Sequence, residues 1–319
     1  MTTYKRLTAR ECADAIIGIE NPIVLIHVRP DGDAVGSAVA LSEIFAQLGK
    51  DAKICSADKI PDRLQFILEY TGAKTAESAE GCTPVSIDVA SPSQLGALRE
   101  SVSPALMIDH HAVGEPFADG YIMPEASSAA EALFDVALAL KEDGKIEITD
   151  KLAFALYAAM SSDTGCFSYS NTSPKTHRYA AMLLETGVDA SDINNRLFNS
   201  KTKEQIKAEG FVASRLQSAG GGKISYASVT IKERCELGLL EEHFDTAIDV
   251  VRSRQGAKIA FFVKEIESGK FKVSLRSTGL DVASVAQGLG GGGHIRAAGC
   301  TVPAKTVDEV IEIIIPRLK

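Results

Sequence analysis

Paired cysteines, long apolar runs and an excess of basic residues are all missing from this chain of 319 residues. Its six cysteines are scattered and form no CxxC pair, which argues against a zinc or thiol redox motif and predicts reduced thiols. No apolar run is long enough for a membrane-spanning helix, so we expect no membrane association. The N-terminal segment MTTYKRLTARECADAI lacks the apolar core of a signal peptide, and we therefore expect a cytoplasmic protein.

The formal charge of -8 argues against a general nucleic-acid coat protein, because sequence-independent affinity for polyphosphate comes from Lys and Arg. The distribution of charge is more informative. Residues 1–190 contain 15 Lys and Arg against 27 Asp and Glu, whereas residues 191–319 contain 19 against 15, which gives -12 and +4. We infer that the acidic part could hold cations and the basic part could hold an anion.

Short apolar runs alternate with helix-length patterns through the first half of the chain. The runs lie at residues 23–28, 85–89 and 105–108, and the helical patterns between them at 34–48 and 92–98. This alternation predicts a parallel α/β sheet whose strands are buried on both faces. Consecutive helices are then expected at residues 128–140, 150–160, 175–185, 192–198 and 203–216.

The length of the chain predicts two domains. The strongest boundary signal is the run Gly220, Gly221 and Gly222. Beyond it, strand-like segments at 223–230, 258–263 and 272–275 precede an amphipathic helix at 307–318, as in a smaller α/β domain. We therefore predict a first domain at 1–190, a helical linker at 191–221 and a second domain at 222–319.

Acidic and imidazole side chains follow the predicted strands. His27, Asp31 and Asp33 come after the first strand, in a segment whose Pro-Asp-Gly-Asp run could equally be a simple turn. Asp88 ends the second strand, and the triplet Asp109-His110-His111 ends the third. In parallel sheets functional groups gather at the carboxyl ends of strands, so these side chains should share one crevice.

Asp163 closes a helical pattern and adds another acid to this set. Clustered carboxylates repel one another at low dielectric, and they need cations to coexist. Four or five acids with two imidazoles are enough to ligate two divalent ions, and mixed oxygen and imidazole ligands suit manganese.

The ordered motifs resemble those of the DHH phosphoesterases. The resemblance rests on HVRPDGDAVGS from His27, the lone Asp88, the triplet at Asp109 and SDTG around Asp163. Near the C-terminus, GGGGHIRAAG and the upstream Ser274-Leu275-Arg276-Ser277 resemble the associated DHHA1 domain. The resemblance covers nearly the whole chain and implies a parallel-sheet DHH catalytic domain joined by a helical linker to a DHHA1 substrate-binding domain.

Within the family, the chain resembles the nanoRNases that also act on 3'-phosphoadenosine 5'-phosphate. The resemblance implies hydrolysis of short oligoribonucleotides to mononucleotides and of that bisphosphate to AMP. A phosphodiesterase for cyclic di-AMP or pApA is the alternative enzyme, and a non-catalytic nucleotide sensor is the alternative from another class. Ala112, Val113 and Gly114 stand where many members have an Asn, and Ser168 where many have an Arg, which leaves the order of substrates open.

The resemblance also implies roles for individual residues. One ion would be held by His27, Asp31 and Asp88, and the other by Asp33, Asp88, His110 and Asp163. Manganese is the expected metal, with Mg²⁺ or Co²⁺ as substitutes. Asp88, Asp109 and His111 are assigned to catalysis, with Asp109 orienting an imidazole and His111 contacting substrate.

The implied substrate contacts in the C-terminal domain are Arg276, Gly291, Gly292, Gly293 and His294. Each assignment has an alternative interpretation. Arg276 could form a salt bridge, and the glycines could be a flexible loop. Asp109 and His111 could be structural caps. Short RNA or nucleotide phosphates are the expected partners, and a homodimer is compatible with the sequence.

Overall fold

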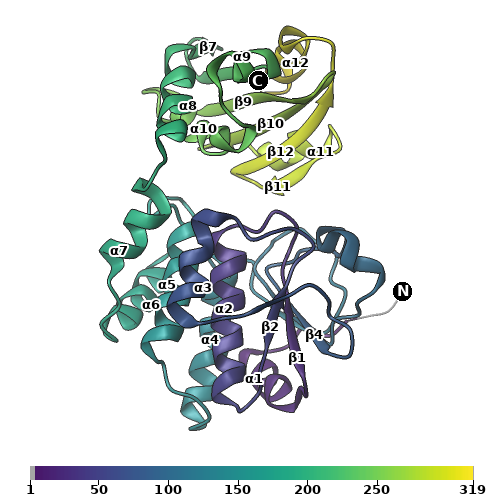
Figure 1. The fold of residues 1–319 in the computed structure, drawn as a ribbon, viewed down its shortest axis with the longest axis vertical. Coiled ribbons are helices and arrows are strands. Elements are labelled where there is room, and N and C mark those ends of the chain that lie inside the picture. The colour runs from purple at the N-terminus through teal and green to yellow at the C-terminus, as the bar shows by residue number, and fades with distance from the viewer. Residues whose placement is uncertain (1–3, 319) are drawn as a thin grey trace. The chain divides into compact units, whose positions relative to one another are not determined.

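The computed structural model describes residues 4–318, except the side chain of His294. The chain divides into two compact units, Met1–Ser200 and Lys201–Lys319. Each unit is built on its own six-stranded sheet (Figure 1). The predicted fold class is confirmed, because the first sheet is entirely parallel and the second unit is a smaller α/β domain. Among residues 4–318, none of the helices combines the length and apolar character that crossing a membrane requires.

The first unit alternates strands and helices. Its strands are β1 (Pro22–Leu25), β2 (Lys53–Cys55), β3 (Thr75–Ala76), β4 (Thr83–Ile87), β5 (Leu106–Asp109) and β6 (Gly120–Ile122). Its α-helices are α1 (Ala9–Gly18), α2 (Gly32–Gln47), α3 (Gln65–Thr71), α4 (Ala129–Glu142), α5 (Asp150–Asp163), α6 (Pro174–Leu184) and α7 (Ala190–Asn194). Short 3₁₀ helices cover Asp62–Leu64 and Pro92–Glu100, and a π-helical turn covers Asn195–Asn199.

The strands of the first sheet lie in the order β3-β2-β1-β4-β5-β6. Because side chains alternate along a strand, Val24 of β1 faces the main core, which it shares with helices α1 to α5. Ile23 and Leu25 face a smaller cluster on the opposite side, where Leu95 of the 3₁₀ segment packs. The three central strands β1, β4 and β5 are therefore adjacent and buried on both faces, as their apolar runs predict.

The second unit contains the other six strands. They are β7 (Gln217–Ala219), β8 (Ile224–Val229), β9 (Ile259–Glu267), β10 (Lys270–Ser277), β11 (Gly292–His294) and β12 (Ala297–Pro303), in the order β11-β12-β10-β9-β8-β7. Only β8 and β9 pair in parallel among these described strands. The helices are α8 (Lys203–Ser214), α9 (Ile231–Leu237), α10 (Ala247–Arg252), α11 (Val282–Gln287) and α12 (Val307–Ile314), with 3₁₀ turns at Glu241–Phe244 and Ile315–Leu318.

Two predicted features differ from the structure. Residues 92–98 were expected to form an α-helix, but this stretch is a 3₁₀ helix interrupted at Gly96, whose φ is 58°. A side chain at Gly96 would collide with Val28, so the interruption lets this segment pack against the loop after β1. The glycine run at 220–222 forms the turn between the antiparallel strands β7 and β8, inside the second unit. The domain limits at 190 and 222 stay predictions, while helix α8 packs with the second unit.

Candidate metal centre

Three adjacent strands deliver the predicted side chains to one edge of the first sheet. His27 follows β1, Asp88 follows β4, and Asp109 is the last residue of β5, directly before His110 and His111. The strands are neighbours in the sheet and run in parallel, so their carboxyl ends meet. The structure thus brings together groups that are separated by more than 80 residues in the sequence.

Helix α2 contributes two more carboxylates from its first turn. Asp31 is the N-cap, and its Oδ1 accepts hydrogen bonds of 3.0 Å from the backbone N–H groups of Asp33 and Ala34. Asp33 is buried, and it accepts a hydrogen bond of 2.8 Å from the Ser37 hydroxyl. The Pro-Asp-Gly-Asp run is therefore a turn into a helix that also directs two carboxylates to the same edge of the sheet.

Asp163 reaches the same place from the end of α5, which packs closely against α2. This approach depends on two glycines of α2. A side chain at Gly36 would lie 2.8 Å from the Ala155 carbonyl oxygen, and one at Gly32 would overlap the Ser162 side chain. Glycine at both positions lets the two helices approach until Asp33 and Asp163 face the same imidazole.

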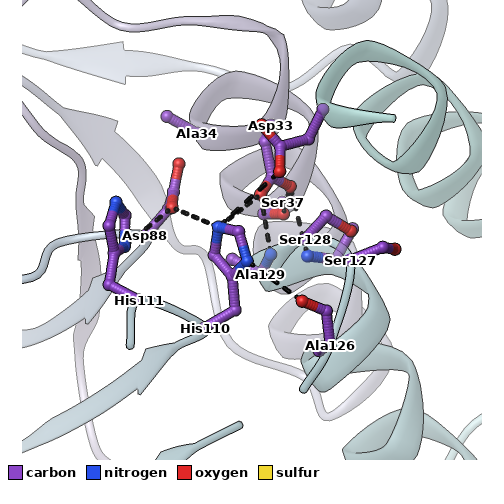
Figure 2. A network of polar contacts seen from close by, with 12 residues as sticks. Asp33, Ala34, Ser37, Asp88, His110, His111, Ala126, Ser127, Ser128 and Ala129 are labelled. Atoms are coloured by element: carbon purple, nitrogen blue, oxygen red, sulfur yellow. Dashed lines mark hydrogen bonds and ion pairs between the residues drawn. The ribbon is translucent and has the colours of Figure 1, made fainter. Parts of the chain in front are cut away.

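Asp88 lies between the imidazoles of the site (Figure 2). Its Oδ2 is 3.6 Å from His27 Nε2, and its Oδ1 is 3.6 Å from His110 Nε2. His27 Nε2 is also 3.8 Å from Asp31, while His110 Nε2 is 3.8 Å from both Asp33 and Asp163. These separations are too long for hydrogen bonds. Two ligands of one ion, each about 2.0–2.2 Å from it, stand about 3–3.5 Å apart, so the spacing suits ligands that surround a metal.

The backbone of Asp88 is strained. Its φ of 57° lies in the left-handed region, which costs a non-glycine residue about 1–3 kcal/mol. The side chain is buried, and Oδ1 has no hydrogen-bond partner among the described residues. A buried carboxylate oxygen without a donor is costly unless a cation neutralises it.

Each imidazole is oriented by its second nitrogen. His27 Nδ1 donates to the Val28 carbonyl at 2.8 Å, and His110 Nδ1 donates to the Ala126 carbonyl at 3.3 Å, so both present Nε2 to the carboxylates. His111 differs, because its Nδ1 lies 2.7 Å from Asp109 Oδ1. Asp109 thus contacts the ring of His111, and its expected role in orienting an imidazole stays a prediction.

Crowding of charge shifts the pKa of several groups. Burial lowers the pKa of His27, but Asp31 and Asp88 outweigh this effect and raise it to about 11. Burial and the charges of Asp31 and Asp88 raise the pKa of Asp163 to about 7. They outweigh the imidazoles of His110 and His111, which lower it. Burial and the carboxylates of Asp88 and Asp163 raise the pKa of Asp33 well above its usual range. Without cations the site is therefore electrostatically frustrated.

The donor set fits divalent ions. Three groups of side chains each place their ligand atoms within 4.8 Å of one another: His27 with Asp31 and Asp88, Asp33 with His110 and Asp163, and Asp88 with His110 and His111. Carboxylate oxygens with imidazole nitrogens are the ligands that Mn²⁺, Mg²⁺ and related ions accept. Asp88 Oδ1, which has no hydrogen-bond partner among the described residues, gives independent support for the fit.

The predicted substrate residues of the second unit lie on β10 and at β11, two strands that are separated by β12. Arg276 of β10 pairs with Ala297 of β12, which pairs with His294 of β11, so the three backbones form one row across the sheet. The side chain of His294 lies outside the described part of the structure. Gly293 has a φ of 136°, and a side chain there would meet the backbone of Ala298 at 2.6 Å. Glycine is therefore required where β11 turns toward β12.

Sequence reasoning missed the groups that hold the ligands. The backbone of Ala129 and Ala130 donates to Asp33, and the Ala126 carbonyl accepts from His110. The Ser128-x-x-Glu131 spacing, typical of a helix N-terminus, was the available signal. It predicts where α4 begins but not which side chains its first N–H groups meet.

Comparison with known proteins places the chain in a family. Residues 21–160 match the DHH family N-terminal domain, and residues 234–319 match the DHHA1 domain. The bifunctional oligoribonuclease and PAP phosphatase NrnA of Thermus thermophilus is 31% identical over 317 residues, which cover 97% of this chain and 93% of that protein. The chain belongs to the DHH family. The resemblance carried by the motifs is thereby confirmed.

Other known proteins are similar to this chain along most of their length. The bifunctional oligoribonuclease and PAP phosphatase NrnA of Bacillus subtilis is 29% identical over 86% of this chain and 87% of its own. Among solved structures, an exopolyphosphatase-related protein from Bacteroides fragilis has a TM-score of 0.87 at 21% identity, over 100% of this chain and 97% of that one. A structure of the exonuclease RecJ bound to manganese has a TM-score of 0.52 at 15% identity, over 98% and 94%. These structures share the fold.

Proposed function

We propose that this protein is a two-metal, manganese-dependent phosphoesterase that hydrolyses short oligoribonucleotides to mononucleotides and 3'-phosphoadenosine 5'-phosphate to AMP. Membership of the DHH family supports a phosphoesterase, and the names of the Thermus and Bacillus relatives support these substrates. The observation that carries the proposal is the position of Asp88, whose two oxygens face different imidazoles in a buried site.

The proposed ligands fall into two sets that share Asp88. His27, Asp31 and Asp88 would hold one ion, and Asp33, Asp88, His110 and Asp163 the other. When bound, such a pair of ions lowers the pKa of a water molecule toward neutrality and neutralises charge on a phosphate. The chain supplies the rigid arrangement, since Asp31 is fixed by the N-terminus of α2 and Asp33 by that of α4.

His111 is the proposed substrate contact beside the metal ligands. Burial lowers the pKa of His111, but the hydrogen bond and charge of Asp109 raise it to about 9. A protonated imidazole held by Asp109 can donate its remaining N–H to a phosphate oxygen and stabilise charge that develops there. Asp109 would act only by orienting His111, at 2.7 Å.

The second unit is proposed to bind another phosphate of the substrate. Arg276 can grip a phosphate through two N–H groups, and the backbone N–H groups of Gly291, Gly292 and Gly293 can approach one closely. His294 belongs to the same proposed site. The basic charge balance of residues 191–319 supports an anionic ligand there.

The test is a side-by-side assay of the purified protein with Mn²⁺. The substrates are 5'-labelled RNAs from dinucleotides to long oligomers, 3'-phosphoadenosine 5'-phosphate, pApA, cyclic di-AMP and pyrophosphate. We expect the shortest RNAs and the bisphosphate to be hydrolysed fastest, and excess EDTA to abolish turnover until Mn²⁺ is restored. Undiminished hydrolysis in EDTA would refute the two-metal mechanism. A preference for cyclic di-AMP or pApA would replace the substrate assignment while keeping the centre.

A further inference from the structure

The segment 126–130, which leads into helix α4, contacts two of the proposed ligands of one ion and is linked to a third through Asn171. Its first contact is the Ala126 carbonyl, which accepts from His110 Nδ1 at 3.3 Å and so sets the direction of Nε2. Two backbone N–H groups of the same segment bind the carboxylate of Asp33, Ala129 at 2.7 Å and Ala130 at 3.2 Å. Figure 2 shows His110 and Asp33 held side by side by this segment.

The third ligand is reached through Asn171. Its side-chain amide donates to the Ser127 carbonyl at 2.9 Å and to the Asp163 backbone carbonyl at 3.1 Å. Asn171 therefore ties the end of helix α5, which carries Asp163, to segment 126–130. Asp33 comes from α2, His110 from the loop after β5 and Asp163 from α5. Segment 126–130 binds Asp33 and His110 directly and reaches Asp163 through Asn171.

Glu131 fixes segment 126–130 from inside the protein. The side chain is 1% exposed, and one carboxylate oxygen, Oε2, accepts three hydrogen bonds. They come from the Ser127 N–H at 3.2 Å, the Ser127 hydroxyl at 2.6 Å and the Thr176 hydroxyl at 2.7 Å. Thr176 is itself fully buried in α6, so the Glu131 carboxylate joins segment 126–130 to helix α6.

The donors around Glu131 are a neutral N–H group and two hydroxyls. Hydrogen bonds to a buried carboxylate are stronger than neutral ones, and they must be complete to offset the cost of burying the charge. An acid in the first turn also favours the helix N-terminus. An exposed Glu would give the same favourable interaction with the helix N-terminus. It would not accept the two hydrogen bonds from Ser127, so the burial of Glu131 points to the fixing of the segment.

We propose that Glu131 is a positioning residue for the metal centre: it locks segment 126–130 so that Asp33, His110 and Asp163 are held ready for one ion. This inference rests on the proposed two-ion function. It assigns Glu131 no contact with metal or substrate. Substitution of the outer partners that orient metal ligands typically costs about 10- to 100-fold in metal affinity.

The experiment compares Mn²⁺ binding to the full chain, by calorimetric titration, in wild type, Glu131→Ala and Asp135→Asn. Asp135 is the matched control, because it lies one turn further along α4 and accepts from Tyr121 at 2.8 Å, Lys175 at 2.7 Å and Tyr179. These three donors lie outside segment 126–130, so Asp135 reports the cost of disturbing a carboxylate network on this helix. Thermal unfolding in EDTA measures that cost for each variant.

We expect Glu131→Ala to weaken one of the two Mn²⁺ binding steps by about 10- to 100-fold and to leave the other near wild type. Raising Mn²⁺ should restore much of kcat at a temperature where the variant is already folded in EDTA, so that the recovery reports metal binding and not refolding. Asp135→Asn should lower the unfolding temperature while both binding steps stay unchanged. The milder variants Glu131→Gln and Ser127→Ala should weaken the same step by smaller factors.

The positioning role would be overturned if Glu131→Ala bound Mn²⁺ in both steps with wild-type affinity. It would also be overturned if Asp135→Asn weakened Mn²⁺ binding as much as Glu131→Ala does. Should Glu131→Ala fail to fold, unchanged binding in both Glu131→Gln and Ser127→Ala would overturn it instead. If the wild type itself binds no Mn²⁺, the proposed function fails rather than this assignment, so the two failures are distinguishable.

Discussion

Asp88 concentrates several physical costs in a single residue. It is buried, its backbone is left-handed, and its Oδ1 lacks a hydrogen-bond donor among the described residues. Burial raises its pKa, but the nearby imidazoles of His27, His111 and His110 outweigh this effect and hold the pKa below its usual range. Asp88 is therefore ionised, which is the state required of a ligand that serves two cations.

The first prediction concerns the substitution Asp88→Asn. Asn tolerates the left-handed backbone and has nearly the same shape, so the fold should persist. The loss of a shared charged ligand should lower kcat at least about tenfold, or about 1.4 kcal/mol. The measurement is kcat at saturating Mn²⁺ and substrate, with Asp51→Asn, an exposed carboxylate, as control. A smaller loss would exclude Asp88 as the bridging ligand.

At the scale of elements, the contact between α2 and α5 brings Asp33 and Asp163, one from each helix, next to the imidazole of His110. Helix α2 is buried along most of its length, and the core around it is built largely of Ala, Val, Leu and Ile. Such interiors are packed as densely as crystals, so they transmit small displacements. The distance between Asp33 and Asp163 therefore depends on residues that carry no functional group.

Gly36→Ala should disturb this contact. The added Cβ would lie 2.8 Å from both the Ala155 carbonyl oxygen and the Ala159 side chain, so the helices must separate. Overpacking of this kind costs about 1–3 kcal/mol of stability. The small shift should lower kcat at least about tenfold, because catalysis is sensitive to misplacement. Chemical unfolding and initial rates measure the two effects.

Gly210→Ala in helix α8 is the matched control for Gly36→Ala. No atom lies within 4 Å of a Cβ at Gly210, so Ala should add about 1 kcal/mol of stability through its higher helix propensity. Activity should stay unchanged. Wild-type activity in Gly36→Ala would show that the helix contact does not set the geometry of the site.

At the scale of the whole molecule, the two units differ in charge as well as in fold. Residues 1–190 carry the carboxylate cluster and a formal charge of -12, from 15 Lys and Arg against 27 Asp and Glu. Residues 191–319 have a formal charge of +4 and contain Arg276 and the glycines 291–293 of the proposed phosphate site. This difference supports the proposed binding of cations by the first unit and of an anion by the second.

Arg276→Ala tests that division of tasks. The side chain belongs to β10 of the second unit, so metal binding to the first unit should be unaffected. Loss of a charge-assisted contact with phosphate should lower kcat/KM for short RNA by about 1.5–3 kcal/mol, or about 10- to 100-fold. The small ester bis-p-nitrophenyl phosphate should be hydrolysed almost normally. Equal losses with both substrates would contradict a role for Arg276 in recognition.

Much of the site followed from local sequence. Apolar runs at 23–28, 85–89 and 105–108 predicted β1, β4 and β5, each within a few residues. Because parallel strands end at one edge, the acids after them could be grouped from the order of the runs alone. The predicted helix at 92–98 is present as a 3₁₀ helix, but its interruption at Gly96 was missed, because the packing of Gly96 against Val28 depends on a distant segment. Strands β2, β3 and β6 were missed, since two or three residues carry too little periodicity.

The sequence by itself determined the family, the parallel sheet and the identity of the clustered acids and imidazoles, because strand burial and motif spacing are local properties. Only the tertiary structure decided the left-handed backbone of Asp88, the pairing of His111 with Asp109 and the hydrogen bonds of segment 126–130 to His110 and Asp33. These features arise where chain segments far apart in sequence meet. Their hydrogen bonds are set by packing, which no short pattern encodes.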